Sequence, residues 1–180
     1  MPFKTKKILL LTIPVLILLM TACEYSDEYT KVSVKEQYQM AFPAYMQPIE
    51  SGKQLNAEAS LTYLNYFRNI YTIVIDKPKK NTPAELVFFY EKEKEKLLQQ
   101  LISPVKIDSN TLTINGLQGF KSNFVGTVKG AGNTDTKIYY RLVFLESPTH
   151  LYQITLWTWY DWRFKYEGVM DKIVGSFEEI

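Results

Sequence analysis

Residues 137–159 read KIYYRLVFLESPTHLYQITLWTW. Two runs rich in β-branched and aromatic residues flank a short segment with a proline, which is typical of two strands joined by a turn. The first run, 137–146, places apolar side chains on both of its faces, so we expect both faces of its sheet to be covered. A connection this short makes the two strands antiparallel neighbours. The stretch therefore predicts an antiparallel sheet buried between two layers.

Further strands are expected on both sides of this stretch. Residues 119–129 alternate, with Phe120, Phe124 and Val128 on one face, and residues 111–115 lead into a turn at Gly116. Nearer the N-terminus, a polar connector separates the first expected strand from the next two. These three strands are predicted at 38–42, 61–65 and 70–76, and the connector covers 43–56.

Two helices are predicted to accompany the sheet. Thr82 and Glu85 form a Thr-x-x-Glu capping box around Pro83, a residue that favours the first helical position. Pro104 ends this helix. We expect Asp161 to cap a second helix. Apolar residues at helical spacing are Leu86, Phe89, Tyr90, Leu97 and Leu101 in the first helix, and Tyr166, Val169, Met170 and Ile173 in the second.

The order of these elements predicts an α+β fold in which an antiparallel β-sheet packs between helices. The charged run 91–96 on the first helix is interpreted as a solvated face, in which Glu91 and Lys94 attract each other across one turn.

The N-terminus has the pattern of a lipoprotein signal peptide. A basic segment with Lys4, Lys6 and Lys7 precedes the apolar run 8–19, and Met20-Thr21-Ala22-Cys23 reads as a lipobox. We expect residues 1–22 to be removed and Cys23, the only cysteine, to be acylated and inserted in the lipid bilayer. The alternatives are an uncleaved anchor and ordinary secretion, but a membrane span needs about 20 apolar residues.

The mature chain is expected to contain a tether and one domain. Residues 23–31 form the lipidated cysteine with an acidic tether, and residues 32–180 form a single α+β domain. Loss of three leader lysines leaves 18 basic and 19 acidic residues, a net charge of −1. No basic field remains to attract nucleic acid. The expected location is the bacterial cell envelope, at the outer membrane, facing the periplasm or the surface, because Glu24 replaces the aspartate that retains enteric lipoproteins at the inner membrane.

A family resemblance supports this architecture. The segments Tyr38-Gln39-Met40-Ala41-Phe42-Pro43, Leu151-Tyr152-Gln153-Ile154-Thr155, Trp157-Thr158 and Ser176-Phe177, with the capped helix between them, occur in a recognisable order. Over residues 32–177 the chain resembles the PsbP/DcrB-like family, whose α-β-α sandwiches include bacterial lipoproteins. The resemblance implies an antiparallel sheet between helices and a binding or accessory role. It transfers no functional residue to a numbered position.

Residues that commonly carry catalysis are sparse. His150 is the only histidine, and its Ser147-Pro148-Thr149-His150 context indicates a surface turn. One histidine cannot form a multi-histidine metal site. We therefore predict no catalytic residue, no metal site and no cofactor. Carboxylates that could form an acid–base pair near the ends of elements are Asp76, Asp108, Asp135, Asp161 and Glu167.

All three tryptophans lie between positions 157 and 162. The rings of Trp159, Tyr160 and Trp162 are candidate residues for binding a sugar or a protein partner. The alternative is that these rings fill the space between the last strand and the last helix. We expect Trp157 to be part of the core, and Trp159 or Trp162 to be partly exposed.

Three functions follow from these observations. The leading hypothesis is a membrane-anchored envelope lipoprotein with a non-enzymatic accessory role toward a protein partner. The alternative is a carbohydrate- or ligand-binding module that uses the tryptophan cluster. A hydrolase is the third hypothesis, and it would require His150 to share a pocket with carboxylates.

Overall fold

The computed structural model describes residues 28–49, 55–80, 85–130 and 134–180. Within these residues the strands form two sheets. The large, seven-stranded sheet contains β3 (Gln47–Pro48), β4 (Leu61–Asn65), β5 (Ile70–Pro78), β6 (Ile102–Ile114), β7 (Leu117–Lys129), β8 (Asp135–Glu146) and β9 (His150–Trp159). The small sheet contains β1 (Tyr29–Val34), β2 (Tyr38–Pro43) and β10 (Glu178–Glu179).

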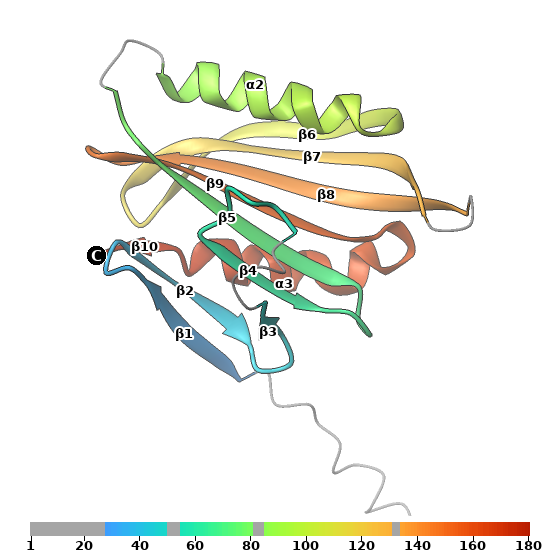
Figure 1. Cartoon of the computed structure of the whole chain (residues 1–180), viewed down its shortest axis with the longest axis horizontal. Coiled ribbons are helices and arrows are strands. Elements are labelled where there is room, and N and C mark those ends of the chain that lie inside the picture. The colour runs from blue at the N-terminus through green and yellow to red at the C-terminus, as the bar shows by residue number, and fades with distance from the viewer. Residues whose placement is uncertain (1–27, 50–54, 81–84, 131–133) are drawn as a thin grey trace, which may run out of the picture.

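Helices cover both faces of the large sheet. Helix α2 (Glu85–Gln99) lies on one face, and α3 (Arg163–Gly175) lies on the other, beside the small sheet (Figure 1). A short 3-10 helix, η2 (Tyr160–Trp162), joins β9 to α3. The predicted α+β fold, with an antiparallel sheet packed between helices, is therefore confirmed.

The large sheet is antiparallel throughout, in the order β3-β4-β5-β9-β8-β7-β6. Strands β6 to β9 form the meander expected from the short connections. Strand β9 then pairs with β5 on its other side, with Gln153 opposite Ile75 and Trp157 opposite Tyr71. This pairing places β9 inside the sheet, so both of its edges are hydrogen-bonded to neighbouring strands.

Each face of the sheet has its own apolar core. Side chains of β8 alternate between the two: Leu142 and Phe144 pack with α2, whereas Val143 and Leu145 pack with α3 and the small sheet. The α2 side is the smaller of the two cores, with Leu86, Phe89, Tyr90, Phe124 and Leu151 as its other buried members. The predicted alternation of Tyr38, Met40 and Phe42 is confirmed, because all three are buried on the α3 side.

The helix ends differ in part from the expectations. Thr82 and Pro83 lie outside the described residues, but the Glu85 carboxylate does accept a hydrogen bond from a preceding backbone amide, that of Lys80, at 2.9 Å. The expected Asp161 cap is wrong. Asp161 lies in η2, and the residue before α3 is Trp162, which makes no side-chain capping bond. The polypeptide enters α3 directly from the 3-10 turn, so no separate capping residue is used.

Strand β6 extends beyond the residues predicted for it, and β1 was not predicted. Strand β6 begins at Ile102, so it includes Pro104, which was predicted only to end the preceding helix. The proline is accommodated because β6 is an edge strand with irregular pairing in this region. Strand β1 begins at Tyr29, so residues 29–31, assigned above to the tether, pair with β2.

A buried arginine joins the sheet to α3. Arg141 on β8 donates to the Asp171 carboxylate of α3 at 2.5 Å and to the Asn123 side-chain oxygen on β7 at 3.0 Å. Its side chain is 4% exposed. A buried guanidinium needs such partners to offset its desolvation. The network therefore fixes the position of α3 on the sheet.

Candidate functional site

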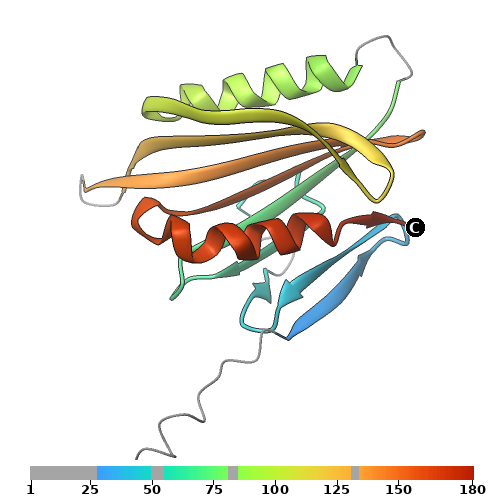
Figure 2. The same cartoon turned by 180° about the vertical axis from the view of Figure 1, so that it is seen from behind.

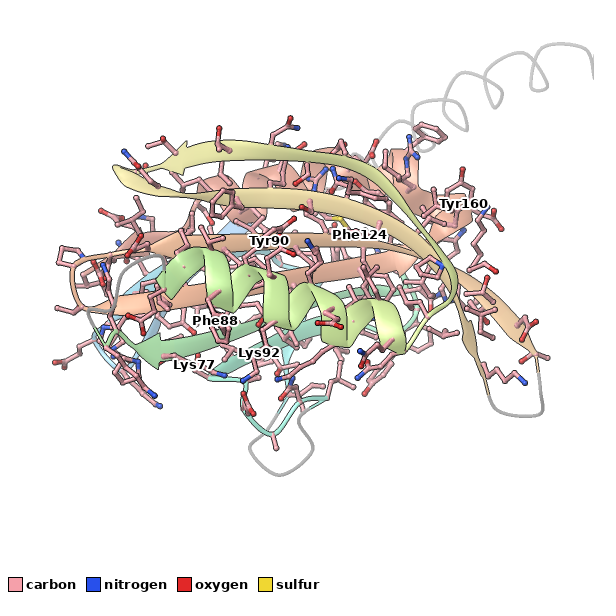
Figure 3. The ribbon with its side chains drawn as sticks, turned by 90° about the horizontal axis from the view of Figure 1, so that it is seen from above. Lys77, Phe88, Tyr90, Lys92, Phe124 and Tyr160 are labelled. Carbon is pink, nitrogen blue, oxygen red and sulfur yellow. The ribbon has the colours of Figure 1, made fainter. Side chains whose placement is uncertain are left out.

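A groove runs between α2 and the β5 side of the large sheet. Helix α2 lies over the sheet so that β5 and the first part of β9 remain open on one side of it (Figure 3). The groove has a polar part of about 410 Å³ at the C-terminal half of α2 and an apolar part of about 880 Å³ at its N-terminal half. Glu93 lines both parts. We name these two cavities the polar part and the apolar part of the α2 groove.

Trp157 forms one wall of the polar part. It lies between Tyr71 of β5 and Tyr140 of β8, which are its partners in the strand register. Its ring stacks on Tyr71 with centroids 5.1 Å apart and on Tyr140 at 6.2 Å. Trp157 is half-buried, so the expectation that it belongs to the core is only partly met. The three rings form a row across the sheet, and burial raises the pKa of Tyr140 to about 12.

Gln153 supplies the polar floor of this part of the groove. It is 7% exposed, and its side-chain nitrogen donates to the Thr155 hydroxyl at 3.1 Å. Its side-chain oxygen is buried and has no hydrogen-bond partner among the described residues. A buried acceptor without a protein partner is costly to folding, so in a cavity it is available to a donor such as water or a ligand hydroxyl.

Charged side chains line the same cavity. Glu93 is 8% exposed and accepts a hydrogen bond from Lys96 at 2.8 Å. This contact raises the pKa of Lys96. Glu58 pairs with Lys77 at 2.9 Å, and the hydrogen bond from Lys77 lowers the pKa of the Glu58 carboxyl. Because each carboxylate has a cationic partner, the polar part carries little net charge.

Two aromatic side chains of α2 line the apolar part of the groove. Phe88 is 72% exposed and Phe89 is buried, and both line this cavity with Leu151. Figure 3 shows Phe88 and Lys92 on the side of α2 that faces β5, with Lys77 beside them. A large exposed ring next to an apolar cavity is a feature of protein-binding surfaces.

The predicted Trp159, Tyr160 and Trp162 cluster lies at the junction of β9 and α3. Trp159 is 43% exposed, and its ring lies 5.7 Å from that of Trp162, which packs on the α3 side of the core. Tyr160 is half-buried, with the Lys137 ammonium 4.1 Å from its ring centre. Figure 3 shows Tyr160 away from the groove. The structure therefore brings the rings of Trp159 and Trp162 together, while the Tyr160 ring contacts Lys137 instead, and none of the three lines the cavity of Trp157.

His150 is half-buried at the start of β9, not in an exposed turn as expected. Gln37 donates to its Nε2 atom at 2.8 Å, and Thr149 bonds its Nδ1 atom at 2.9 Å. His150 does share a shallow depression of about 240 Å³ with two carboxylates, those of Glu36 and Glu179, and Glu179 accepts a hydrogen bond from Tyr152. Both ring nitrogens of His150 already have partners, which leaves neither directed at a substrate.

The five candidate carboxylates are not gathered in one cavity. Asp108 accepts hydrogen bonds from Asn123 at 2.8 and 2.9 Å, and Glu167 pairs with Arg163 at 3.1 Å. None of the five lines a cavity described above. Within the described residues, no three His, Cys, Asp or Glu side chains come close enough to hold a metal ion. Cys23 lies outside the described residues.

Two residues that distinguish the polar part of the groove were not predicted. Gln153 was noted only for its place in a family-like segment, and Glu93 was included in a solvated helix face. A glutamine within an otherwise apolar strand was the available signal for the first. For Glu93 there was no signal, because only the docking of α2 shows which helical positions face the sheet.

Neither helix of the described residues is long and apolar enough to cross a bilayer.

No protein-family model matches the sequence, and no curated protein matches it. Solved structures do match. Cyanobacterial PsbP (CyanoP) from Synechocystis has a TM-score of 0.60 at 12% identity, with 88% of this chain and 96% of that chain covered.

Two further structures have the same arrangement. The Ran-binding protein Mog1p of Saccharomyces cerevisiae has a TM-score of 0.57 at 10% identity, with 85% of this chain and 96% of that chain covered. A protein from Bacteroides thetaiotaomicron has a TM-score of 0.54 at 10% identity, with 83% and 47% covered. At these identities the likeness establishes the fold alone. The chain therefore has the fold shared by PsbP and Mog1, as its resemblance to PsbP/DcrB-like proteins implied.

Proposed function

We propose that this protein is a bacterial envelope lipoprotein, anchored through acylated Cys23, whose domain binds a partner protein in the apolar part of the α2 groove. The lipobox supports the anchor. The exposed ring of Phe88 at the mouth of an apolar cavity is the observation that carries the binding role.

Several features favour binding over catalysis. The nitrogens of His150 are occupied by Gln37 and Thr149, and the candidate carboxylates lie apart. A nucleophile and a base need to meet at one cavity for hydrolysis. The α2 groove offers instead apolar surface flanked by Lys77 and Lys92, which suits a segment of another protein.

The shared fold is compatible with this role. Mog1p is described as a Ran-binding protein, so one protein with this arrangement recognises a protein partner. The surface that this chain would use is argued from its own groove. An exposed aromatic side chain beside an apolar cavity, surrounded by charged side chains, is a common centre of a protein interface.

Site-specific photo-crosslinking in the native bacterium tests the partner. A photoreactive phenylalanine analogue in place of Phe88 is expected to yield a protein adduct after irradiation. The matched control is the same analogue in place of Phe164, which is 79% exposed but lies on α3, on the other face of the sheet. No adduct at position 88, or the same adduct at both positions, would contradict the proposal.

The anchor is tested separately. Labelled palmitate is expected to enter the wild-type protein and not Cys23→Ser. Label retained by Cys23→Ser would show that the lipid is attached elsewhere or that the acylation hypothesis is wrong.

A second candidate is a neutral, hydroxyl-rich ligand such as a sugar in the polar part of the groove. The partnerless acceptor of Gln153 and the adjacent face of Trp157 favour it, because sugars donate hydrogen bonds and stack on aromatic rings. With an N-acetylglucosamine disaccharide as the probe, ligand-observed NMR is expected to detect binding that Gln153→Met abolishes. Gln118→Met on β7, away from this cavity, is the control, and equal loss in both variants would contradict the assignment.

A further inference from the structure

The turn between β4 and β5 presents two exposed aromatic side chains. Tyr66 is 63% exposed and Phe67 is 93% exposed. Two hydrogen bonds within the turn hold its shape: the Arg68 amide donates to the Asn65 side-chain oxygen at 2.9 Å, and the Asn69 amide donates to the Tyr66 carbonyl at 3.3 Å. The two rings are therefore displayed by a structured turn.

This turn lies beside the point where the N-terminal segment joins the domain. Asn65 donates to the Tyr45 carbonyl at 2.6 Å, and the Arg68 guanidinium stacks 4.0 Å from the centre of the Tyr45 ring. The preceding residue, Ala44, donates from its backbone amide to the carbonyl of Glu28 at 2.8 Å. A short chain of contacts thus connects the exposed rings to Glu28, the first described residue.

The length of the tether limits how the domain can face the membrane. Five residue steps separate Cys23 from Glu28, and these span at most about 18 Å when fully extended. A domain of this size has a radius of gyration of about 15 Å, and therefore measures roughly 40 Å across. Because the tether is shorter than the domain is wide, the side that bears Glu28 is held toward the bilayer.

We propose that Tyr66 and Phe67 insert into the interfacial region of the phospholipid bilayer to which Cys23 anchors the chain. The proposal rests on the acylation of Cys23 put forward above. Aromatic side chains favour the boundary between headgroups and acyl chains, where an apolar ring and a polar hydroxyl are both accommodated. The lipid on Cys23 attaches the chain at one point, and the aromatic turn adds a second membrane contact that fixes the orientation of the domain.

Insertion of this turn orients the rest of the molecule. Figures 1 and 2 both show the start of β1 and the β4–β5 turn on the side of the molecule opposite α2. With Tyr66 and Phe67 in the bilayer, α2 and its groove face away from the membrane, where a partner can reach them.

Site-directed spin labelling of the full-length, acylated protein tests this orientation. Cys23 is the only cysteine, and its sulfur is consumed as a thioether to the lipid, so Tyr66→Cys accepts a single label. In reconstituted phosphatidylcholine–phosphatidylglycerol vesicles, we expect the label at position 66 to be more accessible to membrane-dissolved oxygen than to a water-soluble nickel chelate. The reverse order is expected for Phe88→Cys on α2, a similarly exposed position on the opposite side.

Two controls separate insertion from simple proximity. Phe67→Ser in the Tyr66→Cys background is expected to return the label to water, because Phe67 supplies most of the inserted surface. High salt is expected to leave the label buried in the bilayer. Salt screens the attraction between charges, but it does not weaken the contact of an aromatic ring with lipid. A label at position 66 that is as water-accessible as that at 88, or one released by salt, would overturn the proposal.

Mass spectrometry of the same sample shows whether a water-accessible label at position 66 results from failure of insertion or from failure of the proposed anchor. An acylated protein with a water-exposed turn overturns the insertion alone. A protein that lacks the acyl chain overturns the anchor and, with it, the orientation.

Discussion

Trp157 and Trp159 are two positions apart on β9, yet their surroundings differ. Trp157 is held between two tyrosines of the neighbouring strands, whereas Trp159 ends the strand and is 43% exposed. The alternation of a strand places both on one face only while the strand continues. Which ring is covered depends on the neighbours that the sheet supplies.

Replacing each ring separately is expected to show this difference. Trp157→Ala should lower the free energy of unfolding by about 2–3 kcal/mol, somewhat below the loss for a fully buried ring. Trp159→Ala should lower it by less than about 1 kcal/mol. Urea unfolding measures both, and iodide quenching of Trp159→Phe should reveal loss of the accessible emission. A larger loss of stability in Trp159→Ala would contradict the placement of these rings.

At the scale of elements, two glycines have opposite roles. A Cβ atom at Gly119 on β7 would lie 1.8 Å from the backbone carbonyl oxygen of Phe144 on β8, so the two strands approach too closely for any side chain there. Gly168 lies exposed in the middle of α3, where an added methyl group would meet no other atom within 4 Å. The first glycine is needed by the sheet, and the second only weakens the helix.

The two alanine substitutions should therefore change stability in opposite directions. Gly119→Ala is expected to lower the free energy of unfolding by about 3 kcal/mol or more, because the backbone of β7 or β8 must move to make room for the methyl group. Gly168→Ala is expected to raise it by roughly 0.5–1 kcal/mol, the helix-propensity difference between the two residues. Denaturant unfolding measures the stability of both variants. If Gly119→Ala leaves the free energy of unfolding unchanged, β7 and β8 are farther apart than described.

The contact between β8 and α3 can be tested with two aspartates. Asp171→Ala removes the carboxylate from the buried Arg141 guanidinium and is expected to cost about 2 kcal/mol, the value of a hydrogen bond to a charged group. Asp161→Ala should change stability by no more than about 0.5 kcal/mol, because Asp161 caps no helix. Equal losses in urea melts would show that Arg141 does not depend on Asp171.

For the molecule as a whole, buried tyrosines link stability to alkaline pH. Burial raises the pKa of Tyr45, Tyr139 and Tyr140 to about 12 each, from a normal value of about 10. The folded state therefore retains these protons at a pH where the unfolded chain releases them. Stability is fully present below pH 10 and falls as the pH rises toward 12.

We expect the urea midpoint to be lower at pH 11 than at pH 9, with tyrosinate absorbance appearing as the protein unfolds. Tyr140→Phe should make this decline shallower, because it removes one of the titrating groups. An unchanged midpoint across this range would contradict the burial of these hydroxyls.

Most of the fold was predictable because its strands have strong local patterns. The predicted segments 61–65, 70–76 and 119–129 correspond to β4, β5 and β7, with ends that differ by no more than two residues. The edge strand β6 was predicted only in its last part, because its exposed residues and Pro104 lack an alternating apolar face. The capping residue of α3 was predicted wrongly, since a 3-10 turn precedes that helix.

The candidate site was less predictable than the fold. Trp159 and Trp162 are close in sequence and their rings are in contact, but the α2 groove is formed by residues from several distant elements. Phe88 was not singled out, because a helical pattern identifies the buried face and does not show what lies beside the exposed one. Gln153 and Glu93 acquire their importance only from the sheet and helix that enclose them.

The sequence by itself determined the alternation of β8 and β9, the two helices and the antiparallel architecture, because these follow from local side-chain periodicity and short connections. It also supplied the lipobox that motivates the anchor at Cys23. The tertiary structure alone decided that β9 pairs with β5, that α2 leaves a groove, and that the β4–β5 turn contacts Tyr45, the residue after the one that pairs with Glu28. These depend on contacts between residues far apart in the chain, whose energies no local pattern encodes.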